Sequence, residues 1–524
     1  MPHSPLTGFL QRAFSEAVRQ DTGLAASLEA RRRSRREFLR NAVYVAGGLA
    51  VAPGMLQAWP PGGPTGSKKE GRKVAIIGAG IAGLNACYQL KKQGIHATVY
   101  EAAARVGGRM YTLKDRFGAG ITTDIGGEFV DTTHTDIHQL VKELNLPLYD
   151  LREDRLIPKT FYFGGKQLGQ QDLKTAITPF VGRLVADIRS LPEKISHETA
   201  GSFRSLDHQS ITEYLSGIGI GGWLYDFLNV VLTREYGMEA SEQSAVNFLI
   251  MFEAPPAAAT DYELFGNDHE VFKIQGGSQQ LTDALYRQIS DRVVMNHKLV
   301  AIDSHAAGGY RISLEQGGSV RNLDVDYLLL TLPFTILRTL KFSVDMPDEK
   351  RKCIDEIGYG NSCKFVMGMD SKPWRTAGKQ GYTFTDISFG CGWDSSQRQS
   401  EGRGSFTVFG GGDFGDSLYQ RKTEELVKDF IPALDKIYPG AGKAWNGRQV
   451  KFCWAKNPFS AAAYSSFKKG QWSTLAGWEA VPVGNIYFAG EHVSRDFQGY
   501  MNGGAQTARE AAALIAAKIG EPAK

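Results

Sequence analysis

The stretch RKVAIIGAGIAGLNACYQLKKQGIHATVYE, from Arg72 to Glu101, decides the fold of this chain. It reads as a short β-branched strand, a glycine turn, an amphipathic helix and a second strand. Gly78, Gly80 and Gly83 have the GxGxxG spacing, which allows a tight turn, a close approach of backbone to pyrophosphate, and tight packing of the helix on the strand. Glu101 stands where an acid accepts hydrogen bonds from ribose hydroxyls. The stretch therefore predicts a dinucleotide-binding βαβ unit, whereas a mere glycine turn would not account for the strand, the helix and the acid.

The composition is that of a large globular enzyme. The chain has 524 residues, of which 42% are hydrophobic and 22% charged, enough for two cores and too apolar for general disorder. Its formal charge is only +4, and the basic residues do not gather with aromatic residues into one patch. We therefore expect no nucleic-acid partner.

Cysteine and histidine spacings give no sign of a metal site. The five cysteines form no CxxC pair, so we expect neither a disulfide framework nor a zinc site, and at most one disulfide. His134 and His138 are four residues apart on an expected helix, but no glutamate follows His134 as an HExxH motif requires. We predict that both are surface histidines and that the protein has no metal cofactor.

Residues 1–66 predict an export signal and linker. Arg35 and Arg36, followed by an apolar run and a Pro/Gly-rich exit, resemble a twin-arginine signal, which carries folded proteins to the periplasm or beyond. A basic amphipathic surface helix is the alternative. The apolar run from Ala42 to Ala58 is interrupted by glycine and proline and is shorter than the ~20 residues of a spanning helix, so we expect no stable membrane anchor.

Two further segments carry a family resemblance. After the second strand come Glu101, the RVGGR element from Arg105 to Arg109, and DIGG from Asp124 to Gly127. Near the C-terminus, FAGE from Phe488 to Glu491 precedes a long final helix. Together these elements resemble the flavin amine oxidase family, which includes monoamine, polyamine and L-amino acid oxidases. The resemblance runs from about Arg72 to the C-terminus and implies an FAD cofactor.

The resemblance implies which residues bind FAD. Arg109 would neutralise the pyrophosphate as a bidentate donor, and the glycine pair after Asp124 would let backbone approach the flat flavin ring. Gly503 and Gly504 would open the last helix and direct its positive end at the flavin. The full set expected at the cofactor is Gly78, Gly80, Gly83, Glu101, Arg109, Gly126, Gly127, Val300, Gly490, Glu491 and Met501.

The resemblance also implies catalytic residues. Lys364 matches a strand lysine that holds a water near flavin N5, although a solvent-facing strand lysine is the alternative. Tyr464 and Tyr500 match the two tyrosines that flank the substrate amine in monoamine oxidases. Ala463 stands where those enzymes place a flavin-linked cysteine, so we expect non-covalent FAD.

The expected fold is α/β, with a Rossmann-type FAD-binding domain interleaved with a substrate-binding domain that contains a mixed sheet and a helical insertion. The FAD-binding domain is expected in three parts, 67–135, 270–340 and 481–524. A helical substrate region is expected at 136–269 and the rest of the substrate-binding domain at 341–480.

The reaction implied is oxidation of a primary amine or an L-amino acid by hydride transfer to flavin, with molecular oxygen giving hydrogen peroxide. Phe129 occupies the place where venom-type L-amino acid oxidases carry a carboxylate-binding arginine, which favours an amine, although an arginine from the inserted helices could substitute.

The alternatives are a flavin desaturase or porphyrinogen-type oxidase, and a non-catalytic exported flavoprotein. An acidic stretch between Phe252 and Glu270 could favour cationic substrates. The sequence leaves a homodimer possible.

Overall fold

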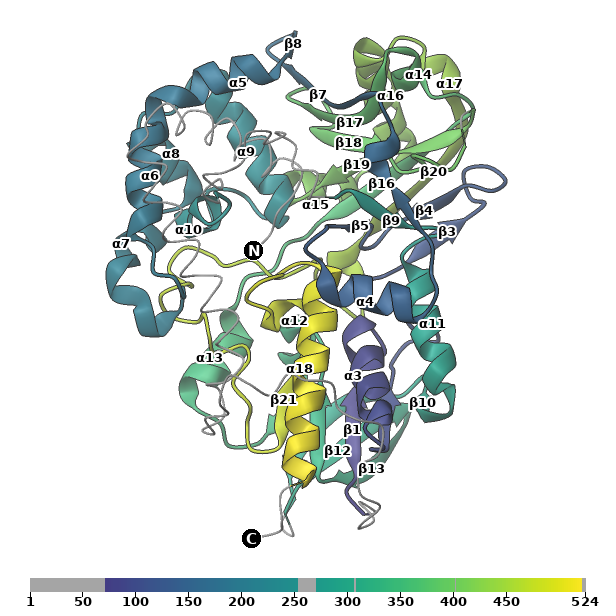
Figure 1. The fold of residues 1–524 in the computed structure, drawn as a ribbon, viewed down its shortest axis with the longest axis vertical. Coiled ribbons are helices and arrows are strands. Elements are labelled where there is room, and N and C mark those ends of the chain that lie inside the picture. Colours follow the sequence, from purple (N-terminus) through teal and green to yellow (C-terminus); the bar gives the residue numbers. More distant parts are fainter. Residues whose placement is uncertain (1–70, 253–269, 306–307, 401, 521–524) are drawn as a thin grey trace, which may run out of the picture.

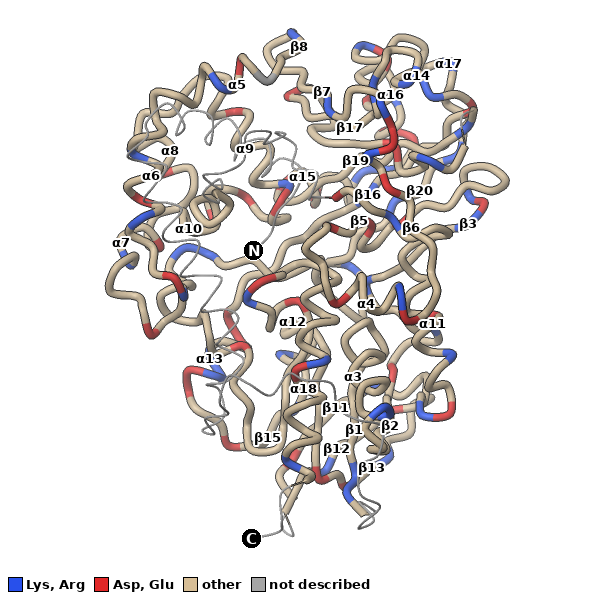
Figure 2. Tube along the Cα trace, in the orientation of Figure 1, with Lys and Arg blue, Asp and Glu red and all other residues tan. Residues whose placement is uncertain are grey.

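The computed structural model describes residues 71–252, 270–305, 308–400 and 402–520 (Figure 1). The predicted export signal and most of the acidic stretch before Glu270 lie outside the described residues. Within them, no helix is both long and apolar enough to span a membrane. Figure 2 shows Lys and Arg interspersed with Asp and Glu along the described chain.

A five-stranded parallel sheet forms the lower half of the molecule in Figure 1. Its strand order is β10 (Val293–Val294), β2 (Ala97–Tyr100), β1 (Val74–Ile77), β14 (Tyr327–Leu330) and β21 (Ile486–Phe488). One face packs against α3 (Ile81–Lys92), α11 (Gln279–Ile289) and α18 (Met501–Gly520). Every residue of β1 is buried, with Val74 and Ile76 in the core on that face and Ala75 and Ile77 in the core on the other.

A second, four-stranded sheet covers the other face of the parallel sheet. Its order is β13 (Ser319–Val325), β12 (Tyr310–Gln316), β11 (Lys298–Ser304) and β15 (Lys341–Ser343), and the same core includes α12 (Phe334–Leu337) and α13 (Asp348–Glu356). The strands of the parallel sheet come from all three segments predicted for the cofactor domain. The α/β architecture, with its interleaved cofactor domain, is the one expected from the sequence.

The upper part of Figure 1 holds a seven-stranded sheet with a helical region beside it. The strand order is β20 (Trp445–Cys453), β16 (Cys363–Met369), β19 (Gly404–Gly410), β18 (Cys391–Asp394), β17 (Lys379–Thr385), β7 (Ile157–Phe163) and β8 (Lys166–Leu168). Only the pair β17 and β7 is parallel. Helices α14 (Pro373–Thr376), α15 (Gly412–Gln420), α16 (Thr423–Ile437) and α17 (Ala441–Ala444) complete this part.

The predicted helical region is not purely helical. It contains α5 (Gln170–Ile177), α6 (Val181–Ser190), α7 (Arg204–Asp207), α8 (Ile211–Gly217), α9 (Gly222–Tyr236) and α10 (Ala245–Leu249), but it also supplies β6 (Leu148–Asp150), β7 and β8. Helices α5 and α6 are separated by a 3₁₀ turn at Thr178–Phe180, where Pro179 cannot donate an α-helical hydrogen bond.

Small strands connect the two halves. β3 (Thr112–Lys114) pairs with β4 (Thr122–Asp124), and β9 (Phe272–Ile274) lies between β5 (Phe129–Val130) and β6. Helix α4 (Thr135–Glu143) follows β5. Its two histidines differ from the prediction, because His134 is buried and contacts Asp131, while His138 is half-buried and its Nε2 lies 2.8 Å from the Asp131 carbonyl. Within the described residues, no three His, Cys, Asp or Glu side chains are grouped as metal ligands.

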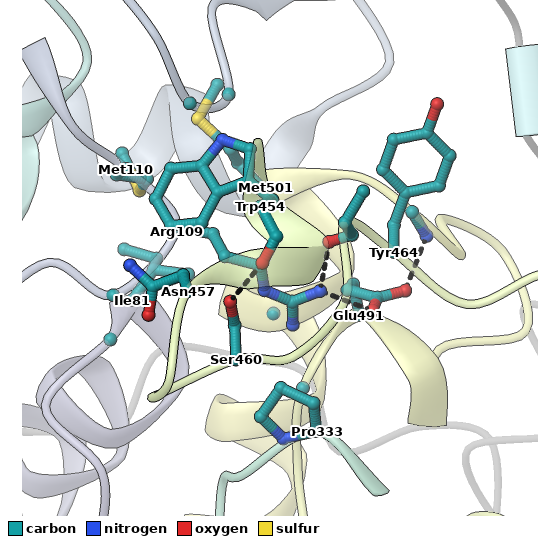
Figure 3. Close-up of a pocket in the computed structure, with 18 of the residues that line it drawn as sticks. Ile81, Arg109, Met110, Pro333, Trp454, Asn457, Ser460, Tyr464, Glu491 and Met501 are labelled. Carbon is teal, nitrogen blue, oxygen red and sulfur yellow. Dashed lines mark hydrogen bonds and ion pairs between the residues drawn. The ribbon is translucent and has the colours of Figure 1, made fainter. Parts of the chain in front are cut away.

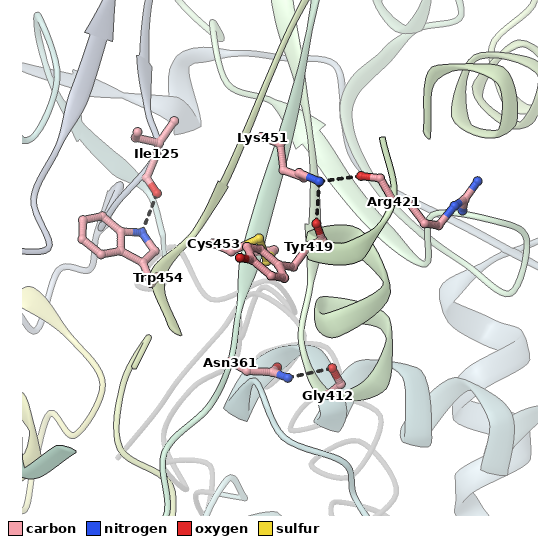
Figure 4. The surroundings of a disulfide bond; sticks show 9 residues. Ile125, Asn361, Gly412, Tyr419, Arg421, Lys451, Cys453 and Trp454 are labelled. Atoms are coloured by element: carbon pink, nitrogen blue, oxygen red, sulfur yellow. Dashed lines mark hydrogen bonds between the residues drawn. A yellow bond between two sulfur atoms is a disulfide. The ribbon is translucent and has the colours of Figure 1, made fainter. Parts of the chain in front are cut away.

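One disulfide joins Cys363 on β16 to Cys453 on β20 (Figure 4). The two cysteines are direct partners in the register of these antiparallel strands. The other cysteines, Cys87, Cys353 and Cys391, are free and buried. The single disulfide agrees with the limit set from the sequence, but its pairing depends on a strand register that spacing alone did not give.

Candidate functional site

A cavity of about 670 Å³ lies where the parallel sheet, the seven-stranded sheet and α9 meet. It begins at the carboxyl end of β1, the usual ligand position in an open parallel sheet. All of the predicted cofactor and catalytic residues line it except Gly83 and Val300. The predicted residues thus converge on one space, although they are spread over most of the chain.

The glycine loop after β1 provides a surface of bare backbone. Gly78 has φ +102°, and its N–H donates to the Tyr100 carbonyl at 2.8 Å. Gly80 forms an isolated bridge with Gly107 of the RVGGR element, so two glycine loops lie against each other. A Cβ atom on Gly83 would lie 1.8 Å from the Gly78 carbonyl oxygen. Gly83 therefore serves the close packing of α3 rather than the cavity wall.

Glu101 closes this end of the cavity. Its carboxylate accepts the N–H of Ala79 at 2.6 Å and that of Ala103 at 2.7 Å. Burial raises the pKa of Glu101, and these backbone donors act in the opposite direction. Because a carboxylate has about four acceptor positions, Glu101 can still accept from ribose hydroxyls. The bare glycine backbone and this acid fit the adenosine diphosphate part of FAD.

Arg109 forms an ion pair with Glu491 (Figure 3). Its Nη1 donates to Glu491 Oε1 at 2.8 Å and to the Ala463 carbonyl at 2.7 Å. Glu491 also accepts from Ser465 Oγ at 2.8 Å and from the Gly499 N–H at 2.9 Å. Burial tends to raise the pKa of Glu491, but Arg109 and the other donors hold it below its usual value. Among the described residues only Nη1 of Arg109 is engaged, which leaves its other donors for a pyrophosphate.

Lys364 is buried with all three of its ammonium donors occupied. It bonds to the carbonyls of Asp124 at 2.9 Å and Gly126 at 3.0 Å, and to Glu128 Oε2 at 2.9 Å. Glu128 accepts a second lysine, Lys273, at 2.7 Å. Lys364 is therefore not a solvent-facing strand lysine, and a water held by it would share one of these donors. Glu128 was not predicted from the sequence, although it directly follows the DIGG element.

The two tyrosines are both attached to the last turn of α9. Tyr464 donates to the Arg234 carbonyl at 3.2 Å and accepts from Ser362 Oγ at 3.2 Å. Tyr500 donates to Glu235 Oε1 at 3.5 Å. Helix α9 stops here because Gly237 adopts the left-handed conformation. The sequence gave no signal for this contact, because α9 lies more than 200 residues before either tyrosine.

Beyond the tyrosines the cavity is aromatic with a few charges. Its wall here includes Phe129, Tyr382, Phe384, Trp393 and Phe409. The rings of Tyr382 and Trp393 stack with centroids 5.5 Å apart. Ionisable side chains in the cavity lining include Arg234, Glu235 and Glu270, and burial raises the pKa of Glu270 well above its usual value. An aromatic chamber with few charges suits a small organic substrate.

Val300 does not line the cavity, whereas its neighbour Leu299 does. Successive residues of a strand face opposite sides, so a shift of one position changes the face. The pairing of β11 with β12 is irregular between Leu299 and Ala301. The sequence alone therefore does not show which residues of β11 face the cavity.

Comparison with known proteins agrees with this site. The family model for flavin-containing amine oxidoreductases matches residues 81–516. A Mycobacterium tuberculosis protein named as a flavin-containing monoamine oxidase, AofH, is 24% identical and covers 85% of this chain and 97% of its own length. A Bacillus subtilis protein named as an L-amino-acid oxidase, YobN, is 23% identical, covering 84% and 94%.

Solved structures show the same fold. Putrescine oxidase bound to putrescine has a TM-score of 0.73 at 20% identity, covering 85% of this chain and 99% of its own. Cyclohexylamine oxidase from Brevibacterium oxydans has a TM-score of 0.74 at 20% identity, covering 86% and 100%.

Proposed function

The chain belongs to the flavin-containing amine oxidoreductase family, and on this premise we propose that it oxidises the carbon–nitrogen bond of a primary amine or an L-amino acid with molecular oxygen as acceptor. It is an FAD-dependent enzyme that acts on small-molecule amines. The observation that carries the proposal is the continuity of one cavity from the glycine cradle to the aromatic chamber, with Lys364, Tyr464 and Tyr500 among its lining residues.

FAD, when bound, supplies a ring nitrogen that takes a hydride from the carbon bearing the amine. Gly78, Gly80 and Glu101 would hold its adenosine end, and Arg109 its pyrophosphate. The start of α18 at Met501 would direct a positive helix end at the flavin. Gly127 lies against Met501, since a Cβ there would be 2.8 Å from the Met501 side chain. This close packing fits a flat ring.

The chain's own residues prepare the amine. The aromatic walls exclude water and thereby disfavour the charged ammonium form of the substrate. The neutral amine is the form that donates the hydride. Glu235 Oε1, bonded to Tyr500, is placed to receive the proton that the ammonium loses. Tyr464 and Tyr500 would orient the amine between their ring faces. Loss of a hydride from the carbon of the neutral amine leaves an iminium cation, which becomes the imine when it releases a proton. Water hydrolyses the imine to ammonia and an aldehyde or keto acid, while oxygen takes two electrons and two protons to become hydrogen peroxide.

Non-covalent attachment of the cofactor follows from Ala463. This residue is buried, and its carbonyl accepts from Arg109. Its methyl side chain has no atom able to form a thioether with the flavin.

Export through the twin-arginine route is part of the proposal. The Cys363–Cys453 disulfide supports it, because disulfides persist in oxidising compartments. Changing Arg35 and Arg36 together to lysine should retain the protein in the cytoplasm, as cell fractionation would show. An unchanged distribution between fractions would contradict this route.

A peroxide assay on the purified flavoprotein tests the function. A panel of primary amines and L-amino acids should contain members that bleach the flavin without oxygen and yield one peroxide per ammonia when oxygen is present. Amine oxidation would be contradicted if no amine or amino acid reduces the flavin but a porphyrinogen or a polyene precursor does.

A further inference from the structure

Arg234 is a cation without a counter-charge in the wall of the substrate cavity. The residue is only 8% exposed, yet its side chain belongs to the cavity lining. Its Nε makes no hydrogen bond, and among the described residues no carboxylate lies within ion-pair distance of its guanidinium. A buried charge is ordinarily paired, so this one calls for a partner that the protein itself does not provide.

The surroundings hold the guanidinium in place without neutralising it. Its carbon lies 4.4 Å from the centre of the Phe414 ring, and a Cβ on Gly390 would be 2.0 Å from Nη2. Glu239 acts on this charge from beyond ion-pair distance, and Glu239 Oε1 already accepts the Asp413 N–H at 2.8 Å. Burial lowers the pKa of Arg234 to about 10, which still leaves it protonated at neutral pH. The cation is fixed, charged and available to an anion.

Arg234 lies beside the two tyrosines that would flank the substrate amine. The Arg234 carbonyl accepts the Tyr464 hydroxyl at 3.2 Å, and the next residue, Glu235, accepts the Tyr500 hydroxyl at 3.5 Å. One helical turn therefore contacts both tyrosines and carries a cation and an anion that both line the cavity. Such a pair complements a molecule that carries a carboxylate and an ammonium on the same carbon.

We propose that Arg234 binds the α-carboxylate of an amino acid substrate, and that the enzyme oxidises α-amino acids in preference to the corresponding simple amines. The inference rests on the proposed function and specifies its substrate class. Phe129, which occupies the place of the carboxylate-binding arginine of related oxidases, then contributes only to the aromatic wall. The arginine that recognises the carboxylate comes from the helical insertion.

Matched substrates test the proposal on the unmodified enzyme. Phenylalanine and 2-phenylethylamine differ only by the carboxylate, as do lysine and 1,5-diaminopentane. We expect kcat/KM for each amino acid to exceed that for its amine by at least about 100-fold, because a site built for an anion leaves a buried cation unpaired when the anion is missing. Equal or better oxidation of both amines would overturn the proposal.

A binding measurement gives a readout that does not require turnover. 3-Phenylpropanoate has the carboxylate but no amine, and 3-phenylpropanamide is its uncharged counterpart. The acid should perturb the flavin absorbance of the holoenzyme and compete with substrate, whereas the amide should not. Arg234→Met should weaken binding of the acid at least about 10-fold, while Arg234→Lys, which keeps the charge, should lose less.

Arg204→Met is the matched control, because Arg204 lies on α7 of the same helical region and is exposed. It should leave both measurements unchanged. If Arg234→Met retains FAD and binds the acid as the parent does, the assignment is wrong. If neither amines nor amino acids reduce the flavin, the proposed function fails, and binding of the acid and the amide still decides the role of Arg234.

Discussion

Glu128 shows how one carboxylate places a lysine in the cavity wall. Two ammonium groups share it, those of Lys364 and Lys273, and Trp393 Nε1 donates to it at 3.1 Å. Of the two lysines, only Lys364 lines the cavity. Burial tends to raise the pKa of Glu128, but the two lysines hold it below its usual value. Glu128 therefore holds the Lys364 ammonium in the cavity wall.

The two lysines allow a controlled test of that role. Lys364→Met should slow reoxidation of the reduced flavin by oxygen about 10-fold or more, because a nearby cation stabilises developing superoxide. Lys273→Met removes the same charge from Glu128 but not from the cavity wall, so it should lower the unfolding temperature while changing the oxygen reaction far less. Stopped-flow mixing of reduced enzyme with oxygen gives both rates, and equal effects of the two changes would remove Lys364 from the oxygen site.

Tyr464 and Tyr500 should act through their ring faces. Tyr→Phe at either position should change flavin reduction less than about 3-fold, since it keeps the ring face and removes only a hydroxyl that bonds to α9. Tyr→Ala at either position should slow it about 10-fold or more, which is at least ~1.4 kcal/mol of barrier. Anaerobic stopped-flow reduction measures this directly. Alanine variants that retain FAD and reduce at the parent rate would exclude the pair from the substrate site.

At the scale of elements, the contact between α3 and the glycine loop after β1 has no room for a side chain at Gly83. Gly83→Ala would place a methyl carbon 1.8 Å from the Gly78 carbonyl oxygen, so the helix must move away from the glycine loop. We expect a loss of at least about 3 kcal/mol in the free energy of unfolding, together with poor retention of FAD.

Gly182→Ala is the contrasting change, because Gly182 is exposed within α6 and a Cβ there meets nothing within 4 Å. It should raise the free energy of unfolding by about 0.5–1 kcal/mol through helix propensity. Denaturant titrations of both variants check the pair. A Gly83 variant as stable as the parent would mean that the loop adjusts without cost.

The disulfide ties two strands whose next residues both line the cavity. Lys364 follows Cys363 on β16, and Trp454 follows Cys453 and donates its Nε1 to the Ile125 carbonyl at 2.8 Å (Figure 4). The two cysteines are 90 residues apart, so the bond restricts a long loop of the unfolded chain. Changing both to alanine should cost about 2–4 kcal/mol of stability.

Dithiothreitol provides the matched comparison for the disulfide. It should lower the unfolding temperature of the parent and leave that of the double alanine variant unchanged. A chromogenic thiol reagent would confirm that the disulfide of the parent is fully reduced. An unfolding temperature of the parent that does not change on complete reduction would contradict this stabilisation.

At the scale of the whole molecule, local signals in the sequence located most of the residues at the glycine-loop end of the cavity and few of those near α9. The GxGxxG loop, Glu101 and the FAGE element are short patterns whose geometry is local. One cavity is lined by Gly78, Gly80, Glu101, Gly490 and Glu491 from these patterns. Glu128, Arg234 and Glu235 were not predicted because their roles arise from contacts between segments far apart in the chain. Val300 was placed one residue from Leu299 because an irregular strand pairing, not local periodicity, sets which residue faces the cavity.

The mode of cofactor attachment can be tested on the intact protein. Acid precipitation should release unmodified FAD into the supernatant and leave a colourless polypeptide, because Ala463 offers no sulfur for a covalent bond. Removing FAD under mild conditions should lower the unfolding temperature. Adding FAD back should raise the unfolding temperature again, and the increase should depend on the FAD concentration. Flavin that stays with the precipitated polypeptide would show that another residue forms the link.

The order of strands in the parallel sheet also has a consequence in time. β1 and β2 come from the beginning of the described chain, but β21, Glu491 and α18 come from its end. A ribosome must therefore have made α18 before all the walls of the flavin site can meet. A chain terminated before β21 would lack Glu491 and α18, and we expect it to leave the flavin in solution.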